Sequence, residues 1–199
     1  MKLRIMPLRP NSMEVQKVIL ALLLCGWYVS MPQVGYVYLG HDTGTLPHII
    51  LTHAEAMLSH ANIWHLLGNL FVLMLVRKLN IIPSVVIAYL ASFIPTVGTL
   101  WDIIGRLTSQ EPVMTMGFSG VLFAMLGVIW GEHVRIWSNT ARYYGYDAME
   151  AFLMKMLPWA LVGFFVPHAN WELHLYSLIG GFTYGFFKDS LWWMQRQKT

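Results

Sequence analysis

Six long intervals without Lys, Arg, Asp or Glu divide this 199-residue chain, and they constrain its fold more than any other feature. A charged side chain at the centre of a bilayer is costly, so uncharged intervals of this length indicate membrane-spanning helices. With 56% hydrophobic and 12% charged residues, the chain has too few charges to cover a soluble globule. The intervals are Val18–His41, Ala56–Val76, Leu79–Trp101, Pro112–Gly131, Met156–Trp171 and Leu173–Phe187.

The intervals predict one all-α polytopic membrane domain over residues 1–199, with residues 1–17 forming a cytoplasmic N-terminal segment. Pro32 and Gly35 are expected to end the first helix near Met31. Val34–Thr52 then forms a surface loop, and His53–Ser59 a short interfacial turn. The six expected spans are roughly 15–34, 58–77, 79–101, 116–136, 149–168 and 171–192.

The positions of the basic residues predict the orientation. If the N-terminus is cytoplasmic, twelve of the thirteen Lys and Arg residues fall inside and only Arg106 falls outside. Both termini are therefore expected in the cytoplasm. The net charge of +3 then belongs to a cytoplasmic membrane face, and we expect no nucleic-acid binding. The single cysteine, Cys25, excludes a disulfide framework and a cysteine-based metal cluster.

Polar residues inside the expected spans lie at one depth. His65, Asn69, Ser119 and His174 each fall within the first two or three turns from the outer face, about 5 to 15 Å deep at the rise of an α-helix. His65 and Asn69 are four residues apart and share a helix face, whereas His60 stands at the edge of its span. Scattered interhelical hydrogen bonds have no reason to share a depth, so the pattern predicts one polar chamber open to the outside.

Ser119 stands in Gly117-Phe118-Ser119-Gly120 at the start of the fourth span. The two glycines leave room for a peptide carbonyl beside the serine. A helix N-terminus also offers unpaired backbone amides and the positive end of the dipole to an oxyanion. The tetrapeptide therefore marks Ser119 as a candidate nucleophile.

Two stripes of small residues predict that the fourth and sixth spans touch. If the stripes meet in parallel, Ser119 and His174 come within hydrogen-bonding distance, and a serine beside an imidazole is an activated nucleophile. Glu172 is expected to be a solvated charge of an outer loop, so a dyad is favoured over a triad. The stripes are Gly120, Ala124, Gly127 and Gly131 in the fourth span, and His174, Ser177, Gly181 and Gly185 in the sixth.

With these motifs in this order, the chain resembles the rhomboid intramembrane serine proteases in their compact six-helix bacterial form. The motifs that support the resemblance are His60-x4-His65-x3-Asn69, Gly117-Phe118-Ser119-Gly120 and His174-x2-Ser177-x3-Gly181-x3-Gly185. The resemblance implies that Ser119 is the nucleophile and His174 the general base. It implies oxyanion stabilisation by the Ser119 amide, His65 and Asn69. His60, Gly117, Gly120, Phe123 and Gly181 would support the site.

The sequence departs from the family pattern in four ways. The usual Trp-Arg pair of the first loop falls at Leu51 and Thr52, and the glycine-and-glutamate pattern after the second helix is missing. Ser177 replaces the first glycine of the sixth-helix motif, which either loosens the dyad or gives His174 a hydrogen bond. Phe123 replaces a tyrosine that stacks on the catalytic histidine, and it keeps the stacking face.

The expected function is hydrolysis of peptide bonds near the outer end of single-span membrane proteins, without a cofactor or metal, in a bacterial inner membrane. One alternative is a catalytically inactive rhomboid relative that binds membrane proteins as a chaperone. Another is a proton or metal-ion pathway through His60, His65 and His174. The sequence leaves the substrate, its entry route and the oligomeric state open.

Overall fold

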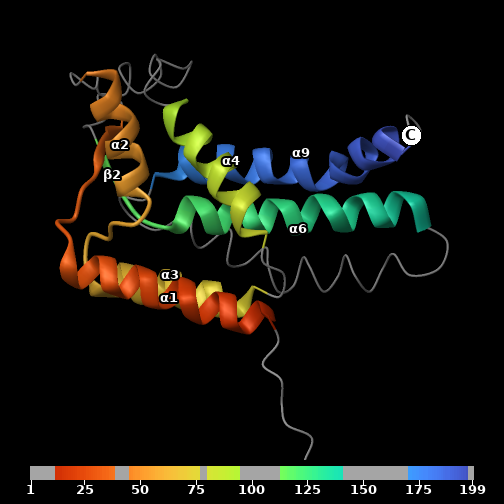
Figure 1. Cartoon of the computed structure of the whole chain (residues 1–199). Coiled ribbons are helices and arrows are strands. Elements are labelled where there is room, and N and C mark those ends of the chain that lie inside the picture. The colour runs from red at the N-terminus through yellow and green to blue at the C-terminus, as the bar shows by residue number, and fades with distance from the viewer. Residues whose placement is uncertain (1–11, 39–44, 77–79, 95–112, 141–169, 197–199) are drawn as a thin grey trace, which may run out of the picture.

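The computed structural model describes residues 12–38, 45–76, 80–94, 113–140 and 170–196, which are mainly helical (Figure 1). The expected helical bundle is present in these residues. The expected fifth span, 149–168, and the end of the third, 95–101, lie outside the described residues. The elements are α1 (Ser12–Ser30), β1 (Tyr36–Tyr38), α2 (Leu46–Ala56), α3 (Ile63–Leu75), α4 (Ile81–Phe93), β2 (Val113–Thr115), α6 (Ser119–Thr140) and α9 (Trp171–Arg196).

Local sequence signals set the ends of α1 and α3. The first helix ends at Ser30, close to Pro32, as the position of the proline predicts. Asn62 precedes α3, and its side-chain oxygen accepts a 2.9 Å hydrogen bond from the backbone N–H of His65. This N-cap satisfies one of the amides at the helix start and fixes how far along α3 His65 and Asn69 lie.

Helices α6 and α9 lie side by side and run in the same direction through the centre of the bundle (Figure 1). A Cβ atom at Gly127 or Gly131 would collide with the backbone of α9, and one at Gly181 or Gly185 would collide with the backbone of α6. Two backbones approach this closely only where side chains are absent. The predicted contact between the two small-residue stripes is therefore confirmed.

The other described helices lie beside this pair or cross it. Helix α4 packs across α6 and α9, while α1 packs antiparallel to α3 (Figure 1). The buried Lys17 of α1 donates a 3.0 Å hydrogen bond to the Met74 carbonyl near the end of α3 and pairs with Glu14 at 3.1 Å. A cation at a helix C-terminus satisfies a free carbonyl and the negative end of the dipole, so Lys17 fastens the two helices.

A small sheet, which the sequence did not predict, joins the first loop to the segment before α6. Strands β1 and β2 are antiparallel, with Tyr36 opposite Thr115 and Tyr38 opposite Val113. Each strand has three residues, too few to show the alternation that identifies a strand in a sequence. The sheet ties the entry to α6 to the first loop.

The expected loop at Val34–Thr52 and turn at His53–Ser59 are wrong over Leu46–Ala56, which forms the 11-residue helix α2. Pro47 in the first turn suits a helix start. The helix is held by tertiary contacts: the His53 ring stacks on Phe93 with centroids 4.2 Å apart, and His53 Nδ1 lies 2.7 Å from Ser92 Oγ. A helix this short depends on such contacts, which a sequence pattern does not reveal.

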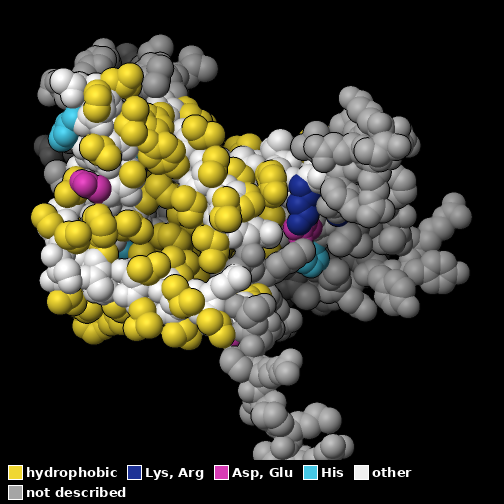
Figure 2. Space-filling model, in the orientation of Figure 1, with side chains coloured by type: hydrophobic (Ala, Val, Ile, Leu, Met, Phe, Trp, Pro, Cys, Tyr) yellow, Lys and Arg dark blue, Asp and Glu magenta, His cyan; other side chains and the backbone are white. Residues whose placement is uncertain are grey.

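Hydrophobic side chains dominate the outer surface of the described helices (Figure 2). Soluble monomers rarely expose a contiguous apolar surface of this kind. Among the described helices, α1 holds the one window, Met13–Ser30, that is long and apolar enough to cross a membrane by itself, while α3 and α4 are shorter apolar helices. The exposed side chains include Val18, Leu22, Leu23, Val29, Trp64, Phe71, Ile82, Leu90 and Phe187.

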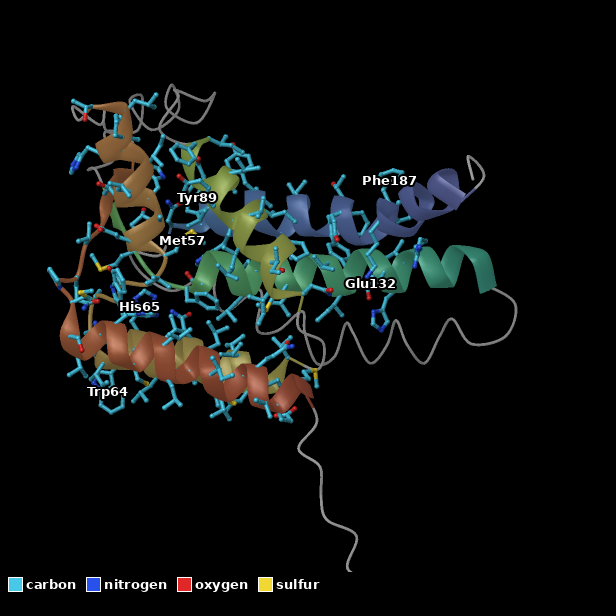
Figure 3. The ribbon with its side chains drawn as sticks, in the orientation of Figure 1. Met57, Trp64, His65, Tyr89, Glu132 and Phe187 are labelled. Atoms are coloured by element: carbon cyan, nitrogen blue, oxygen red, sulfur yellow. The ribbon has the colours of Figure 1, made fainter. Side chains whose placement is uncertain are left out.

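An ion pair joins α6 and α9 far from Ser119. Glu132 of α6 accepts a hydrogen bond from Lys188 of α9, about 20 Å along α6 from Ser119 by helical rise. Glu132 is 4% exposed, and Figure 3 shows it well away from the end of α6 where His65 lies. Because each charge neutralises the other, a carboxylate can be buried between the helices there.

Candidate active site

Ser119 begins α6, directly after a turn that requires glycine. Gly117 has a φ of +122°, a backbone conformation that L side chains rarely adopt. Its N–H donates a 2.7 Å hydrogen bond to the Ala56 carbonyl at the end of α2. The turn therefore holds Ser119 at a helix N-terminus, where the dipole favours negative charge.

His174 of α9 faces Ser119 across the helix pair. Its Nε2 lies 2.9 Å from Ser119 Oγ, and its side chain is 5% exposed. Both residues stand at the beginnings of parallel helices, at the same end of the pair. The structure thus brings together the serine and the histidine that the small-residue stripes predict to meet, and a hydroxyl hydrogen-bonded to an imidazole can act as an activated nucleophile.

Phe123 stacks on His174. The ring centroids are 4.2 Å apart and the planes differ by 10°. Phe123 lies one turn after Ser119 on α6, so the same helix supplies the hydroxyl at the edge of the imidazole and the apolar face beneath it. This stacking, expected from the resemblance, limits rotation of the imidazole away from Ser119.

His65 and Asn69 of α3 point at the turn before Ser119. A Cβ at Gly117 would lie 2.6 Å from His65 Cε1 and 3.6 Å from Asn69 Nδ2, so both side chains lie against this glycine. The Asn69 side chain is buried, and Nδ2 has no hydrogen-bond partner among the described residues. Figure 3 shows His65 on the inner side of α3, whereas the adjacent Trp64 points away from the bundle. A buried amide without an acceptor is available to a substrate oxygen.

His60 lies in the connection before α3 and does not face Ser119. Its Nδ1 donates a 3.1 Å hydrogen bond to the Leu58 carbonyl, and its backbone N–H donates one of 2.9 Å to Gln33 Oε1. The His60 ring meets the His65 ring edge to face at 5.2 Å. These contacts tie the end of α1 and the first loop to the edge of the site, a geometry that suits structural support.

Two polar residues of α9 differ from expectation. The expectation that Glu172 is a solvated charge of an outer loop is wrong, because Glu172 is 2% exposed and lies at the start of α9. A helix N-terminus favours a carboxylate, which the position of Glu172 within the first turn allows. Ser177 is fully buried, and its hydroxyl has no hydrogen-bond partner among the described residues, so the structure contains no Ser177–His174 hydrogen bond.

Asn170 and Thr115 belong to the site region, although the sequence motifs do not predict a role for either residue. Asn170 precedes α9, and its Oδ1 accepts a 2.9 Å hydrogen bond from the Leu173 N–H. Its Nδ2 donates a 2.9 Å hydrogen bond to Thr115 Oγ1 of β2. An asparagine four residues before His174 is a recognisable N-cap signal, whereas its partner in β2 cannot be found from the sequence.

A small cavity of about 10 Å³ lies beside the turn before Ser119. It is bordered by Gly117 and Gly120 on one side and by Ala56 of α2 and Ala88 of α4 on the other. A volume near 10 Å³ is close to that of one water molecule by this measure. The cavity is therefore narrow, and the larger side chains of Met57, Met116, Val121 and Leu173 also line it.

The first loop, where the Trp-Arg pair is missing, has its own anchors. Leu51 is exposed and Thr52 is buried, and neither supplies the missing contacts of a tryptophan or an arginine. Instead, His53 binds Ser92, and the Tyr89 hydroxyl donates a 3.1 Å hydrogen bond to the Ile50 carbonyl (Tyr89 is labelled in Figure 3). Both contacts fix α2 against α4.

Comparison with known proteins agrees with the sequence motifs. The family model described as Rhomboid domain matches residues 48–189, more than two thirds of the chain and all of the candidate site residues. Neither a search of curated proteins nor a search of solved structures found a match.

Proposed function

Because the chain belongs to the rhomboid family, we propose that it is an intramembrane serine endopeptidase that uses a Ser119–His174 dyad. Members of this family are membrane-embedded and are generally intramembrane serine proteases, although some are inactive. The observation that carries the proposal is the 2.9 Å distance between His174 Nε2 and Ser119 Oγ at the start of two parallel helices. An inactive relative would have no need to keep this pair.

In the proposed reaction, His174 Nε2 takes the hydroxyl proton as Ser119 Oγ bonds to the carbonyl carbon of the scissile peptide. His174 then gives this proton to the leaving nitrogen as the C–N bond breaks, which leaves an acyl ester on Ser119. Water attacks the ester while His174 accepts a proton from the water. Collapse of the second tetrahedral intermediate returns the proton to Ser119 and releases the carboxylic acid product.

The negative oxygen of each tetrahedral intermediate is proposed to lie beside Gly117. There it can accept hydrogen bonds from the Ser119 amide, His65 and Asn69, with the N-terminus of α6 adding favourable dipole potential. The partnerless Nδ2 of Asn69 and the closeness of both side chains to Gly117 support this assignment. Since the donors are already held in place, little reorganisation is needed as the charge develops.

Reaction with a serine-directed fluorophosphonate in detergent tests the proposal. We expect the wild-type protein to be labelled and to cleave a single-span substrate, and Ser119→Ala to do neither. Thermal unfolding of both proteins checks that each is folded. A folded wild-type protein that neither reacts nor cleaves would overturn the proposal and favour an inactive, substrate-binding relative.

His65→Ala and Asn69→Ala are each expected to lower kcat/KM by about 10²-fold to 10³-fold, the usual loss for one oxyanion donor. The losses stay partial because the Ser119 amide remains. Asn69→Asp, which keeps the size but loses the Nδ2 donor, should be at least as impaired as Asn69→Ala. Cleavage rates of a purified single-span substrate measure these effects.

His48→Ala on the exposed side of α2 and Asn80→Ala before α4 are matched controls for this series, and both should cleave at the wild-type rate. If Asn69→Ala also retained the wild-type rate, the oxyanion assignment of Asn69 would be incorrect.

The proposed substrates are single-span membrane proteins cut near the outer end of the transmembrane segment. With both termini cytoplasmic, Ser119 and His174 lie a few turns below the outer face, where water can reach an unwound peptide. Gly117 and Gly120 on either side of Ser119 border a cavity of about 10 Å³, and this small volume supports a small residue before the cut. The positive-inside pattern further supports residence in a bacterial inner membrane.

Mass spectrometry of cleaved substrates tests the position and the residue preference. We expect cuts after Ala or Ser, and slower cleavage when that residue becomes Leu or Phe. Replacing a downstream Gly by Leu should also slow cleavage, because an intact helix hides its carbonyls behind internal hydrogen bonds. Cuts at the bilayer centre or the cytoplasmic end, or indifference to both changes, would contradict this substrate class.

A further inference from the structure

We propose that Asn170 is a positioning residue that keeps Ser119 and His174 at reacting distance by binding the start of α9 and strand β2 at the same time. The proposal rests on the proposed protease activity and adds a residue pair, Asn170–Thr115, to the two side chains that carry out the chemistry. Neither residue belongs to the motifs that identify the nucleophile and the base.

Asn170 is bound on three of its polar atoms. Its Oδ1 accepts the Leu173 N–H at 2.9 Å, its backbone carbonyl accepts the His174 N–H at 3.2 Å, and its Nδ2 donates to Thr115 Oγ1 at 2.9 Å. Asn170 is 7% exposed and Thr115 is 5% exposed, so water does not compete freely for these bonds. The first two bonds fix the opening turn of α9, and the third attaches that turn to β2.

The two ends of this link lie at equal distances along the chain from the reacting groups. Thr115 precedes Ser119 by four residues, and Asn170 precedes His174 by four residues. Between Thr115 and Ser119, the backbone is held further by the bond from Gly117 N–H to the Ala56 carbonyl. A shift of α9 relative to β2 would therefore change the distance between Ser119 and His174 by a similar amount.

The Asn170 side chain caps α9 with its oxygen and binds Thr115 with its nitrogen. Aspartate or serine could accept the Leu173 N–H and cap α9 equally well. Asparagine carries an amide donor alongside its acceptor, and Thr115 Oγ1 accepts from that donor, whereas the single hydroxyl of serine is too short to reach both Leu173 N–H and Thr115 Oγ1. Asn170→Ser consequently keeps a capping oxygen but, with one short hydroxyl in place of the two-armed amide, removes the link, while Thr115→Val removes the acceptor and leaves the cap untouched.

Misplacing reacting groups by about 1 Å can cost about 10²-fold in rate. We therefore expect Thr115→Val to lower kcat for a single-span substrate by roughly 10-fold to 100-fold. Thr115→Ser, which retains the hydroxyl, should restore most of kcat. Asn170→Ser should lower kcat like Thr115→Val, and the double variant should lose no more than either single one.

Thr183→Val provides the matched control. Thr183 is an exposed threonine of α9 that donates a hydrogen bond to the Ile179 carbonyl, far from the link, so its replacement should leave kcat unchanged. Hydrogen–deuterium exchange gives a readout that needs no catalysis. Thr115→Val should speed exchange of the Leu173 and His174 amides, while Thr115→Ser and Thr183→Val should not.

Wild-type kcat and unchanged amide exchange in Thr115→Val would overturn the proposal. So would a Thr115→Ser variant as slow as Thr115→Val, because packing of the threonine methyl would then be the cause. If the wild-type protein has no protease activity, the proposed function is wrong. The exchange of the Leu173 and His174 amides still decides in that case whether the link fixes α9.

Discussion

Replacing Ser119 or His174 by alanine is expected to reduce proteolysis by about 10⁴-fold to 10⁶-fold, and the double variant should be no slower than either single one. In the proposed mechanism, the nucleophile and its base act as one unit through their 2.9 Å contact. Loss of either residue therefore removes the function of the other. Rates of single-span substrate cleavage in detergent, together with fluorophosphonate labelling, measure the effect. Additive losses would show that the two residues act separately.

Matched substitutions elsewhere guard this prediction against a general loss of stability. Ser84→Ala removes a fully buried hydroxyl of α4, and His133→Ala removes an imidazole of α6 whose Nδ1 donates to the Ile129 carbonyl. Both lie outside the site and should leave labelling intact. A Ser119→Ala protein that cleaves at the wild-type rate would refute the assignment of the nucleophile.

Gly181→Ala is expected to inactivate the protein by separating its central helices. The added Cβ would meet the Ala124 carbonyl of α6, and backbone atoms cannot move aside as the end of a flexible side chain can. Overpacking of this kind costs about 1 to 3 kcal/mol or more, and Gly181→Val should cost more than Gly181→Ala. Since α9 also carries His174, we expect a lower melting temperature together with loss of fluorophosphonate labelling.

Gly68→Ala in α3 and Gly26→Ala in α1 are the controls, because a Cβ at either position meets nothing within 4 Å. Both variants should remain as stable and as reactive as the wild type. A Gly181→Ala protein with wild-type melting and labelling would show that α6 and α9 are not packed backbone to backbone.

The sequence predicts the helix contacts that bring the candidate site residues together better than it predicts the contacts that support them. The depth shared by Ser119 and His174, and the small residues behind each of them, are properties of helices, whose regular rise and periodicity translate residue numbers into space. Pro32 predicts where α1 ends for a different local reason, because its ring and its missing N–H do not allow the helix to continue. The contact of α6 with α9 could therefore be expected before any coordinates.

What the sequence does not predict depends on contacts between segments far apart in the chain. The strands at Tyr36–Tyr38 and Val113–Thr115 are too short for a periodic signal, and α2 is held by His53 on Ser92. Glu172 looks like a loop charge because its burial depends on the packing of α9. The partner of Asn170 is 55 residues away, beyond any local rule.

The ion pair between Glu132 and Lys188 has a consequence for how the bilayer-embedded site could open. The dyad joins α6 and α9 at one end, the ion pair joins them at the other, and glycine-mediated contact lies between. Two contacts about 20 Å apart along parallel helices oppose both the rotation and the sliding of one helix against the other. We therefore expect α6 and α9 to move as one unit when a substrate binds.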